Sequence, residues 1–132
     1  MFLMENDGEN ILLTEEDIVR IKKILNEKKF EDFKIHKHYF RSKFGDSIMN
    51  IPRHEIGLEE LKDIYDRKYQ IKRGFKRKTN IGYLYTLCYD ESKNVFVKVG
   101  YILDEEPQKI FSAMRIFRNL DGAVKRKYAL SI

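Results

Sequence analysis

The sequence has one cysteine, two prolines and no tryptophan among its 132 residues. The single cysteine, Cys88, excludes an intrachain disulfide, and the cysteine and histidine spacings of zinc sites do not occur. We therefore expect neither a metal site nor another cofactor. Cys88 lies within an apolar run, which predicts a buried structural side chain and not a nucleophile.

Long apolar runs are missing as well. No stretch approaches the roughly 20 apolar residues of a membrane-spanning helix. Residues 1–7 have neither the basic start nor the apolar centre of a secretory signal peptide. We therefore expect a cytoplasmic protein with no membrane partner. The length and the 42% hydrophobic content suit one folded domain over residues 11–132, preceded by a flexible polar lead-in at 1–10.

Positive charge is abundant but unevenly placed. The first 32 residues hold nine acidic and five basic residues, whereas the other hundred hold twelve acidic and 21 basic residues. Five of the eight residues from Ile71 to Lys78 are cationic, and Lys125–Tyr128 is a second basic cluster. Such clusters are typical of solvated loops, but also of nucleic-acid-binding surfaces, because phosphates bind the cations and unpaired bases stack on aromatic rings. The predicted nucleic-acid contacts are Lys72, Arg73, Lys76, Arg77, Lys78, Lys125, Arg126 and Lys127.

Two helices are predicted in the first half of the chain. Thr14 and Asp17 have the spacing of a capping box, and apolar residues follow at helical intervals to about Lys28. The same periodicity predicts a second helix over residues 57–68. The remaining assignments are a short strand or helix entry at 33–39 and irregular structure at 41–55.

The second half of the chain is predicted to be mostly strand. Strand-forming residues indicate strands at 69–75, 81–89 and 95–103, with a hairpin loop at 90–94. The segment 107–121 suits either a helix or a strand. The predicted fold class is α+β, with two N-terminal helices packed on an antiparallel meander of three or four strands and a short basic C-terminal segment.

Four short strings stand out between residues 33 and 128. They are Lys37–Tyr39 followed by Arg41, Gly57–Leu61, Lys109–Ala113 and Val124–Tyr128. Together they resemble the RelE-like superfamily of small ribonuclease toxins, in particular its BrnT-like branch. That family has an arginine directly after the Ser-Ala pair of its late strand, whereas this sequence has Met114 there and Arg115 one residue later. In a strand, these two side chains would point to opposite faces.

The resemblance implies a metal-independent endoribonuclease, the toxin of a toxin–antitoxin pair, with RNA as substrate and an acidic antitoxin as protein partner. Such an enzyme needs a general base, a general acid and cations around the phosphate. His38 is the acid–base candidate, and Arg41 lies three residues away. Arg115 is a candidate for the phosphate, and Tyr128 for base stacking or proton donation. The second hypothesis is a non-enzymatic binding protein of phage or virus type, which occupies a nucleic-acid groove or inhibits a protein partner.

Overall fold

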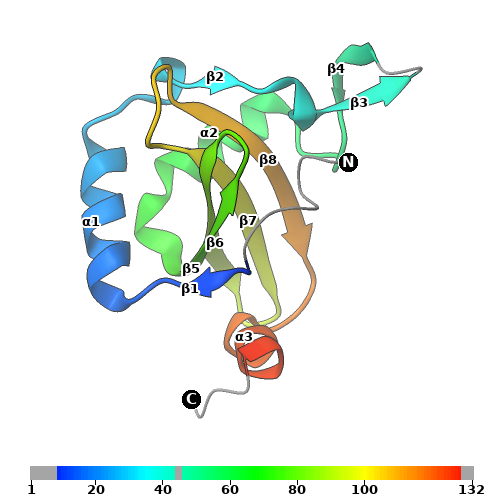
Figure 1. Cartoon of the computed structure of the whole chain (residues 1–132). Helices are drawn as coiled ribbons and strands as arrows, with labels where there is room; N and C mark the ends of the chain where they lie inside the picture. The colour runs from blue at the N-terminus through cyan, green and yellow to red at the C-terminus, as the bar shows by residue number, and fades with distance from the viewer. Residues whose placement is uncertain (1–8, 44–45, 129–132) are drawn as a thin grey trace.

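The structure is a computed structural model that describes residues 9–43 and 46–128, apart from the side chains of residues 41–43, 46–50 and 128. A six-stranded sheet forms its centre, with the strand order β1-β5-β6-β7-β8-β2 (Figure 1). Neighbouring strands are antiparallel, except that β2 and β8 are parallel. The bounds are β1 Ile11–Leu12, β2 Lys34–Ile35, β5 Ile71–Thr79, β6 Gly82–Ser92, β7 Val95–Ile102 and β8 Lys109–Ile116.

The prediction of two N-terminal helices on a meander of three or four strands is wrong. A meander, β5–β8, is present, but β1 and β2 extend it at both edges to a mixed six-stranded sheet. A third helix, α3 (Leu120–Tyr128), follows β8. β1 and β2 have two residues each, so no alternating pattern can mark them in the sequence. Their backbones complete the sheet edges, where the Lys34 amide donates to the Gln108 carbonyl at 2.9 Å.

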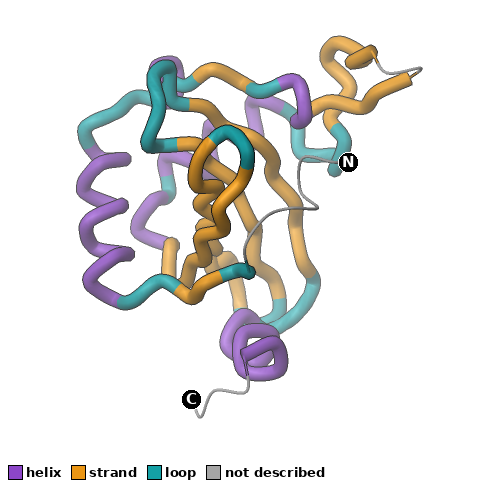
Figure 2. The backbone as a smooth tube through the Cα atoms, viewed as in Figure 1, coloured by secondary structure: helices purple, strands orange, loops and turns teal. Residues whose placement is uncertain are grey.

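Residues 33–55 are also more regular than predicted. After β2 the chain makes one turn of 3₁₀ helix, η2 (Lys37–Tyr39), and enters the strands β3 (Phe40–Lys43) and β4 (Asp46–Pro52). β3 and β4 form a separate two-stranded sheet, which Figure 2 shows at the end of the molecule away from α3. The prediction of irregular structure at 41–55 is therefore wrong for these strands. The segment left open at 107–121 contains the strand β8.

Two helices cover one face of the six-stranded sheet, which we call the inner face (Figure 1). The helix α1 (Glu15–Asn26) begins with the predicted capping box: the Asp17 amide donates to Thr14 Oγ1 at 3.0 Å, and the Thr14 amide donates to Asp17 Oδ2 at 3.2 Å. The second helix is α2 (Leu58–Asp66). The inner-face core joins both helices to β6 and β7 through Ile21, Leu25, Leu61, Ile64, Leu87, Val97 and Val99. The Tyr65 hydroxyl ties α2 to the end of α1 by donating to the Leu25 carbonyl at 2.8 Å.

The opposite, outer face of the sheet is covered mainly at one end. There Leu120 and Val124 of α3 pack on Phe75, Cys88 and Phe96.

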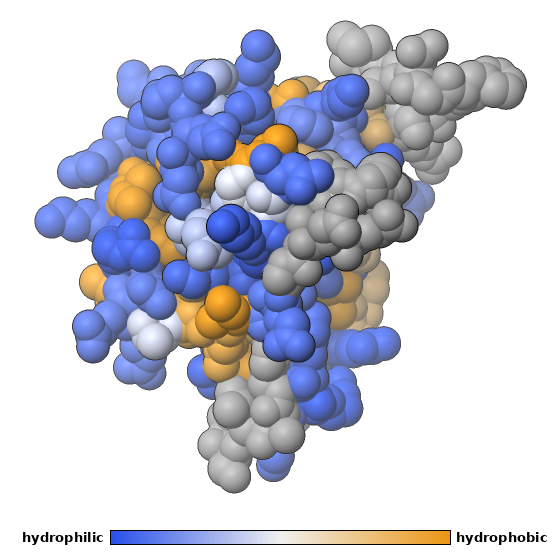
Figure 3. Space-filling model, viewed as in Figure 1, coloured by the Kyte–Doolittle hydropathy of each residue, from blue (hydrophilic) through white to orange (hydrophobic). Residues whose placement is uncertain are grey.

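No described helix is both long enough and apolar enough to cross a membrane. Figure 3 shows a mostly hydrophilic surface in this view, with apolar atoms in separate areas.

Cys88 is fully buried, as predicted, but it faces α3 and not the side of Tyr85, Leu87 and Tyr89. Burial raises the pKa of its thiol to about 12, so the reactive thiolate is scarce at pH 8. We expect the native protein to react slowly with a thiol reagent at this pH, and the unfolded protein to react at the rate of a free cysteine. Absorbance of the released chromophore measures both rates. Equal rates would contradict the burial of Cys88 under α3.

Candidate nucleic-acid interface

Strand pairing places a lysine near the middle of the outer face. The Cα register aligns Arg73 of β5, Cys88 of β6, Lys98 of β7 and Met114 of β8 in one row across the sheet. The next row contains Gly100, where an added Cβ would lie 2.8 Å from the Ser112 hydroxyl. Neighbouring side chains therefore fill the space over Gly100. Lys98 itself is half-buried and borders a hollow.

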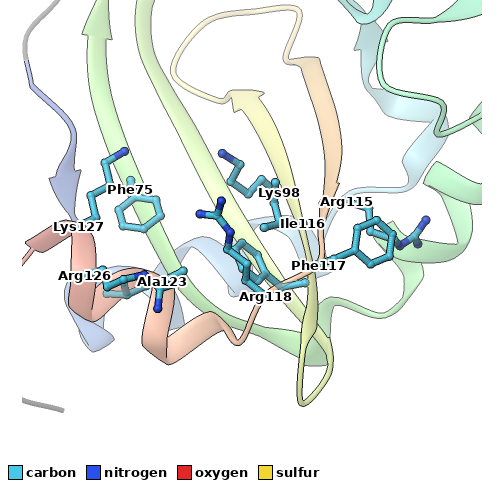
Figure 4. Close-up of a pocket in the computed structure, with 11 residues that line it drawn as sticks. Phe75, Lys98, Arg115, Ile116, Phe117, Arg118, Ala123, Arg126 and Lys127 are labelled. Carbon is cyan, nitrogen blue, oxygen red and sulfur yellow. The ribbon is translucent and has the colours of Figure 1, made fainter.

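Two hollows of the outer face meet at Lys98. The larger, which we call the α3 hollow, has a volume of about 670 Å³ and lies between the sheet and α3 (Figure 4). The smaller, the histidine hollow, has a volume of about 230 Å³ and is lined by His38, His54 and Arg77 among others. Lys98 lines both. The two hollows therefore share one cation.

The charged side chains that line the two hollows are all cationic. None of the described residues that line either hollow is acidic. Burial lowers the pKa of Lys98, and the neighbouring charges of Lys127 and Arg118 lower it further. Neither Lys98 nor Arg118 forms an ion pair with a described acidic side chain. An anion bound among these side chains would relieve their mutual repulsion, so the arrangement favours a phosphate-bearing ligand.

Two imidazoles border the histidine hollow. His38 in η2 stacks on Phe111 with 4.7 Å between ring centroids, and His54 lies in the turn after β4. Burial lowers the pKa of both imidazoles below the ordinary value of 6.5. Arg53 lowers both further, and Lys98 acts on His54 as well. Both rings are therefore largely neutral at pH 7 and can accept a proton.

A third histidine supports the position of His38. His36 Nδ1 accepts the backbone amide of His38 at 3.0 Å, so neutral His36 carries its proton on Nε2. The His36 ring also packs against Phe111, with 4.5 Å between centroids. The His36 amide donates to the Ile110 carbonyl at 2.9 Å, which attaches η2 to β8. The sheet edge thus holds His38 over the outer face.

The basic run of β5 is divided between the two faces because strand residues alternate. Arg73 and Arg77 lie on the outer face, whereas Lys76 and Lys78 align with tyrosines of β6 on the inner side. Arg73 forms an ion pair with Asp121 of α3 at 3.1 Å. Lys72 is exposed beside a register shift. Arg77 is therefore the residue of this run that lines a hollow next to Lys98.

The second basic cluster lies on α3. Lys125, Arg126 and Lys127 are all exposed. Arg126 and Lys127 line the α3 hollow, and Lys127 Nζ lies 5.9 Å from the centroid of Phe75. The structure thus brings part of each predicted basic cluster, residues far apart in the sequence, to the same face of the sheet.

The two predicted catalytic residues whose side chains the structure describes, His38 and Arg115, lie apart from each other. His38 lines the histidine hollow. Arg41 belongs to β3 and Tyr128 to α3, but their side chains lie outside the described residues. Arg115 borders the α3 hollow, yet Figure 4 shows its guanidinium pointing away from Lys98. The catalytic roles of all four residues stay predictions.

Arg115 is engaged by carboxylates. Its guanidinium donates to Glu91 at 2.9 and 3.1 Å and lies 2.7 Å from a carboxylate oxygen of Glu60 in α2. Val97, an inner-face residue, is its register partner, whereas Met114 is paired with Lys98. The expected opposite orientation of Met114 and Arg115 in a strand is therefore confirmed. Arg115 joins β8, α2 and β6 through charge-assisted hydrogen bonds.

Lys98, His54 and Arg118 are not among the site residues predicted from the sequence. One signal was available: Lys98 is the only charged residue of β7, between Val97 and Val99. A lysine in the middle of a central strand must have solvent or an anion beside it. His54 had no comparable signal, because only the fold brings it near Lys98.

No family model, curated protein or solved structure matches the chain. The resemblance to RelE-like toxins therefore stays a hypothesis. The function has to be inferred from the geometry and charge of the two hollows.

Proposed function

We propose that the protein binds RNA on the outer face of the sheet and cleaves it without a metal ion. One observation supports this proposal above all: Lys98, Arg77 and the imidazoles of His38 and His54 line the same hollow. No carboxylate is among the described residues that line it. Cations at this point hold a phosphate, and imidazoles move protons near neutral pH. A ligand with a phosphate and an ionisable hydroxyl beside it uses all four groups, and RNA has both at every nucleotide.

The reaction follows from these groups. One imidazole takes the proton of the 2′-hydroxyl while the 2′-oxygen attacks the adjacent phosphorus. Lys98 and Arg77 stabilise the charge of the pentavalent phosphate. The bond from phosphorus to the 5′-oxygen breaks, and the second imidazole, in its protonated form, gives that oxygen a proton. The products are a 2′,3′-cyclic phosphate and a 5′-hydroxyl end, and His38 and His54 are the two imidazoles.

The toxin hypothesis is part of this proposal. Where RelE-like proteins have an arginine, this chain has Met114, and Lys98 lies beside Met114 in the same row of the outer face. Lys98 thus supplies a cation at that place from the neighbouring strand. We place the activity in the cytoplasm, with an acidic antitoxin that covers the cationic face as the protein partner. Arrested growth on expression without that partner is the cellular test.

Binding without cleavage is the second candidate. It is favoured by Phe111, which packs against both His36 and His38 and so gives these imidazoles a structural role. In this case the same cations hold a nucleic acid that stays intact.

One incubation separates the two candidates. Purified protein is mixed with a pool of single-stranded RNA, with and without EDTA, and with DNA of the same sequences. We expect RNA cleavage that persists in EDTA, cyclic phosphate ends, and intact DNA because it lacks the 2′-hydroxyl. RNA that is bound but intact supports the binding candidate. RNA that is neither bound nor cut overturns both.

A further inference from the structure

The α3 hollow is not used by the cleavage reaction, which needs only the histidine hollow. Its volume of about 670 Å³ lies within the range of roughly 300–1,000 Å³ that is typical of small-molecule sites. The apolar part of its lining comes from Phe75, Phe96 and Ile116 of the sheet and Ala123 and Val124 of α3. A site of this size with an apolar base needs a ligand that has a flat or apolar part.

The polar part of the same lining is cationic. Figure 4 shows Lys98 and Arg118 side by side, with Lys127 across the hollow next to Phe75. Arg126 of α3 completes the group. The ligand therefore combines an apolar, ring-like part with negative charge. A nucleotide has this chemistry, since its base is flat and its phosphate is anionic.

We propose that the α3 hollow is a subsite for one unpaired nucleotide of single-stranded RNA, next to the phosphate at Lys98. The shared position of Lys98 makes the two hollows consecutive along one strand. The base enters between the sheet and α3, and its phosphates lie among Lys98, Arg118 and Lys127. A base paired in a duplex cannot enter such a hollow, so the substrate is single-stranded at this position. This inference rests on the proposed binding of RNA.

Ala123 offers a matched pair of variants. It lies on α3 and lines the hollow without a polar group. Ala123→Glu adds a negative charge there, and Ala123→Gln adds the same shape without charge; both residues are good helix formers. The probe is a fluorescent single-stranded 2′-O-methyl oligoadenylate, which lacks the 2′-hydroxyl nucleophile and therefore stays intact. Fluorescence anisotropy gives the dissociation constant, and circular dichroism checks that each variant is folded.

We expect Ala123→Glu to bind about tenfold more weakly than Ala123→Gln, because the added carboxylate repels the phosphate and competes with it for the cations of the hollow. Arg118 lies before the first residue of α3 and lines the same hollow, so Arg118→Gln should also weaken binding about tenfold. Arg20→Gln on α1 is the control and should bind like the wild type. The duplex of the probe with its complement should bind more weakly than the single strand.

The outcomes separate the two proposals. If the wild type binds the probe, and Ala123→Glu and Arg118→Gln bind it as tightly as the wild type does, the nucleotide subsite is wrong and RNA binding stands. Equal binding of duplex and single strand also overturns the subsite. If the wild type binds neither the probe nor RNA, the proposed function fails and the subsite fails with it.

Discussion

His38→Ala and His54→Ala are each expected to slow RNA cleavage by about 10²-fold or more, the usual contribution of a positioned acid or base. Both rings line the hollow that holds Lys98 and Arg77, and no other described titratable imidazole does. His36→Ala should slow cleavage much less, because His36 does not line the hollow and touches His38 only by accepting its backbone amide. Initial rates on one labelled RNA measure the three variants.

The pH profile of the wild type tests the same assignment. The base must be neutral and the acid protonated, so kcat/KM peaks between the two imidazole pKa values of the unbound protein. Because burial and nearby cations lower both pKa values below 6.5, the maximum should lie below pH 6.5 and the rate should fall as pH rises further. Each alanine variant should lose one limb of this profile. Two variants that cleave like the wild type would remove the imidazoles from the mechanism.

Arg115→Ala belongs in the same assay as a test of the RelE-like prediction. Its guanidinium is held by Glu91 and Glu60 on the side away from Lys98, so we expect its loss to change the rate much less than the loss of either imidazole. A loss as large as that of His38→Ala would show that Arg115 reaches the phosphate.

The parts of the fold that the sequence predicted are those with local signals. The capping box at Thr14 and the apolar period of α1 depend on residues within two turns of one another. The strands β5, β6 and β7 are long enough for their alternation to be visible. The edge strands β1 and β2 have no local signal, because long-range pairing alone defines them.

The segment 107–121 suits a helix because Ile110, Met114 and Phe117 have the spacing of one helix face. In the strand, Ile110 faces the inner core, whereas Met114 pairs with Lys98 on the outer face. Helical spacing in the sequence therefore did not correspond to one face of the structure.

A register shift beside Gly100 gives β8 an extra residue. Phe111, next to this bulge, packs on the outer face and is the ring on which His38 stacks. The bulge thus builds part of the candidate site.

The candidate site was only partly predictable for the same reason. The density of charge pointed to Arg77, Arg126 and Lys127, and acid–base chemistry pointed to His38. Lys98 and His54 are 44 positions apart in the sequence. Only the strand order and the turn after β4 bring them to one hollow, so no local pattern could pair them.

Lys98→Gln is expected to produce the largest loss of RNA affinity of any single lysine variant, because Lys98 is the cation common to both hollows. Phosphate contacts release counterions, with a log–log salt slope of about −0.7 for each phosphate neutralised on a single strand. If Arg77, Arg118, Arg126, Lys127 and Lys98 each hold a phosphate, the slope is about −3.5, and affinity falls about 10²-fold between 50 and 200 mM salt.

Lys98→Gln should therefore weaken binding at every salt concentration and make the slope less steep by about 0.7. Lys23→Gln is the control, since Lys23 is exposed on α1, on the other side of the sheet, and should leave both affinity and slope unchanged. Anisotropy titrations of a labelled single-stranded RNA over a series of salt concentrations give both quantities. An affinity that is independent of salt, or equal slopes for Lys98→Gln and Lys23→Gln, would show that the outer face does not hold the phosphates.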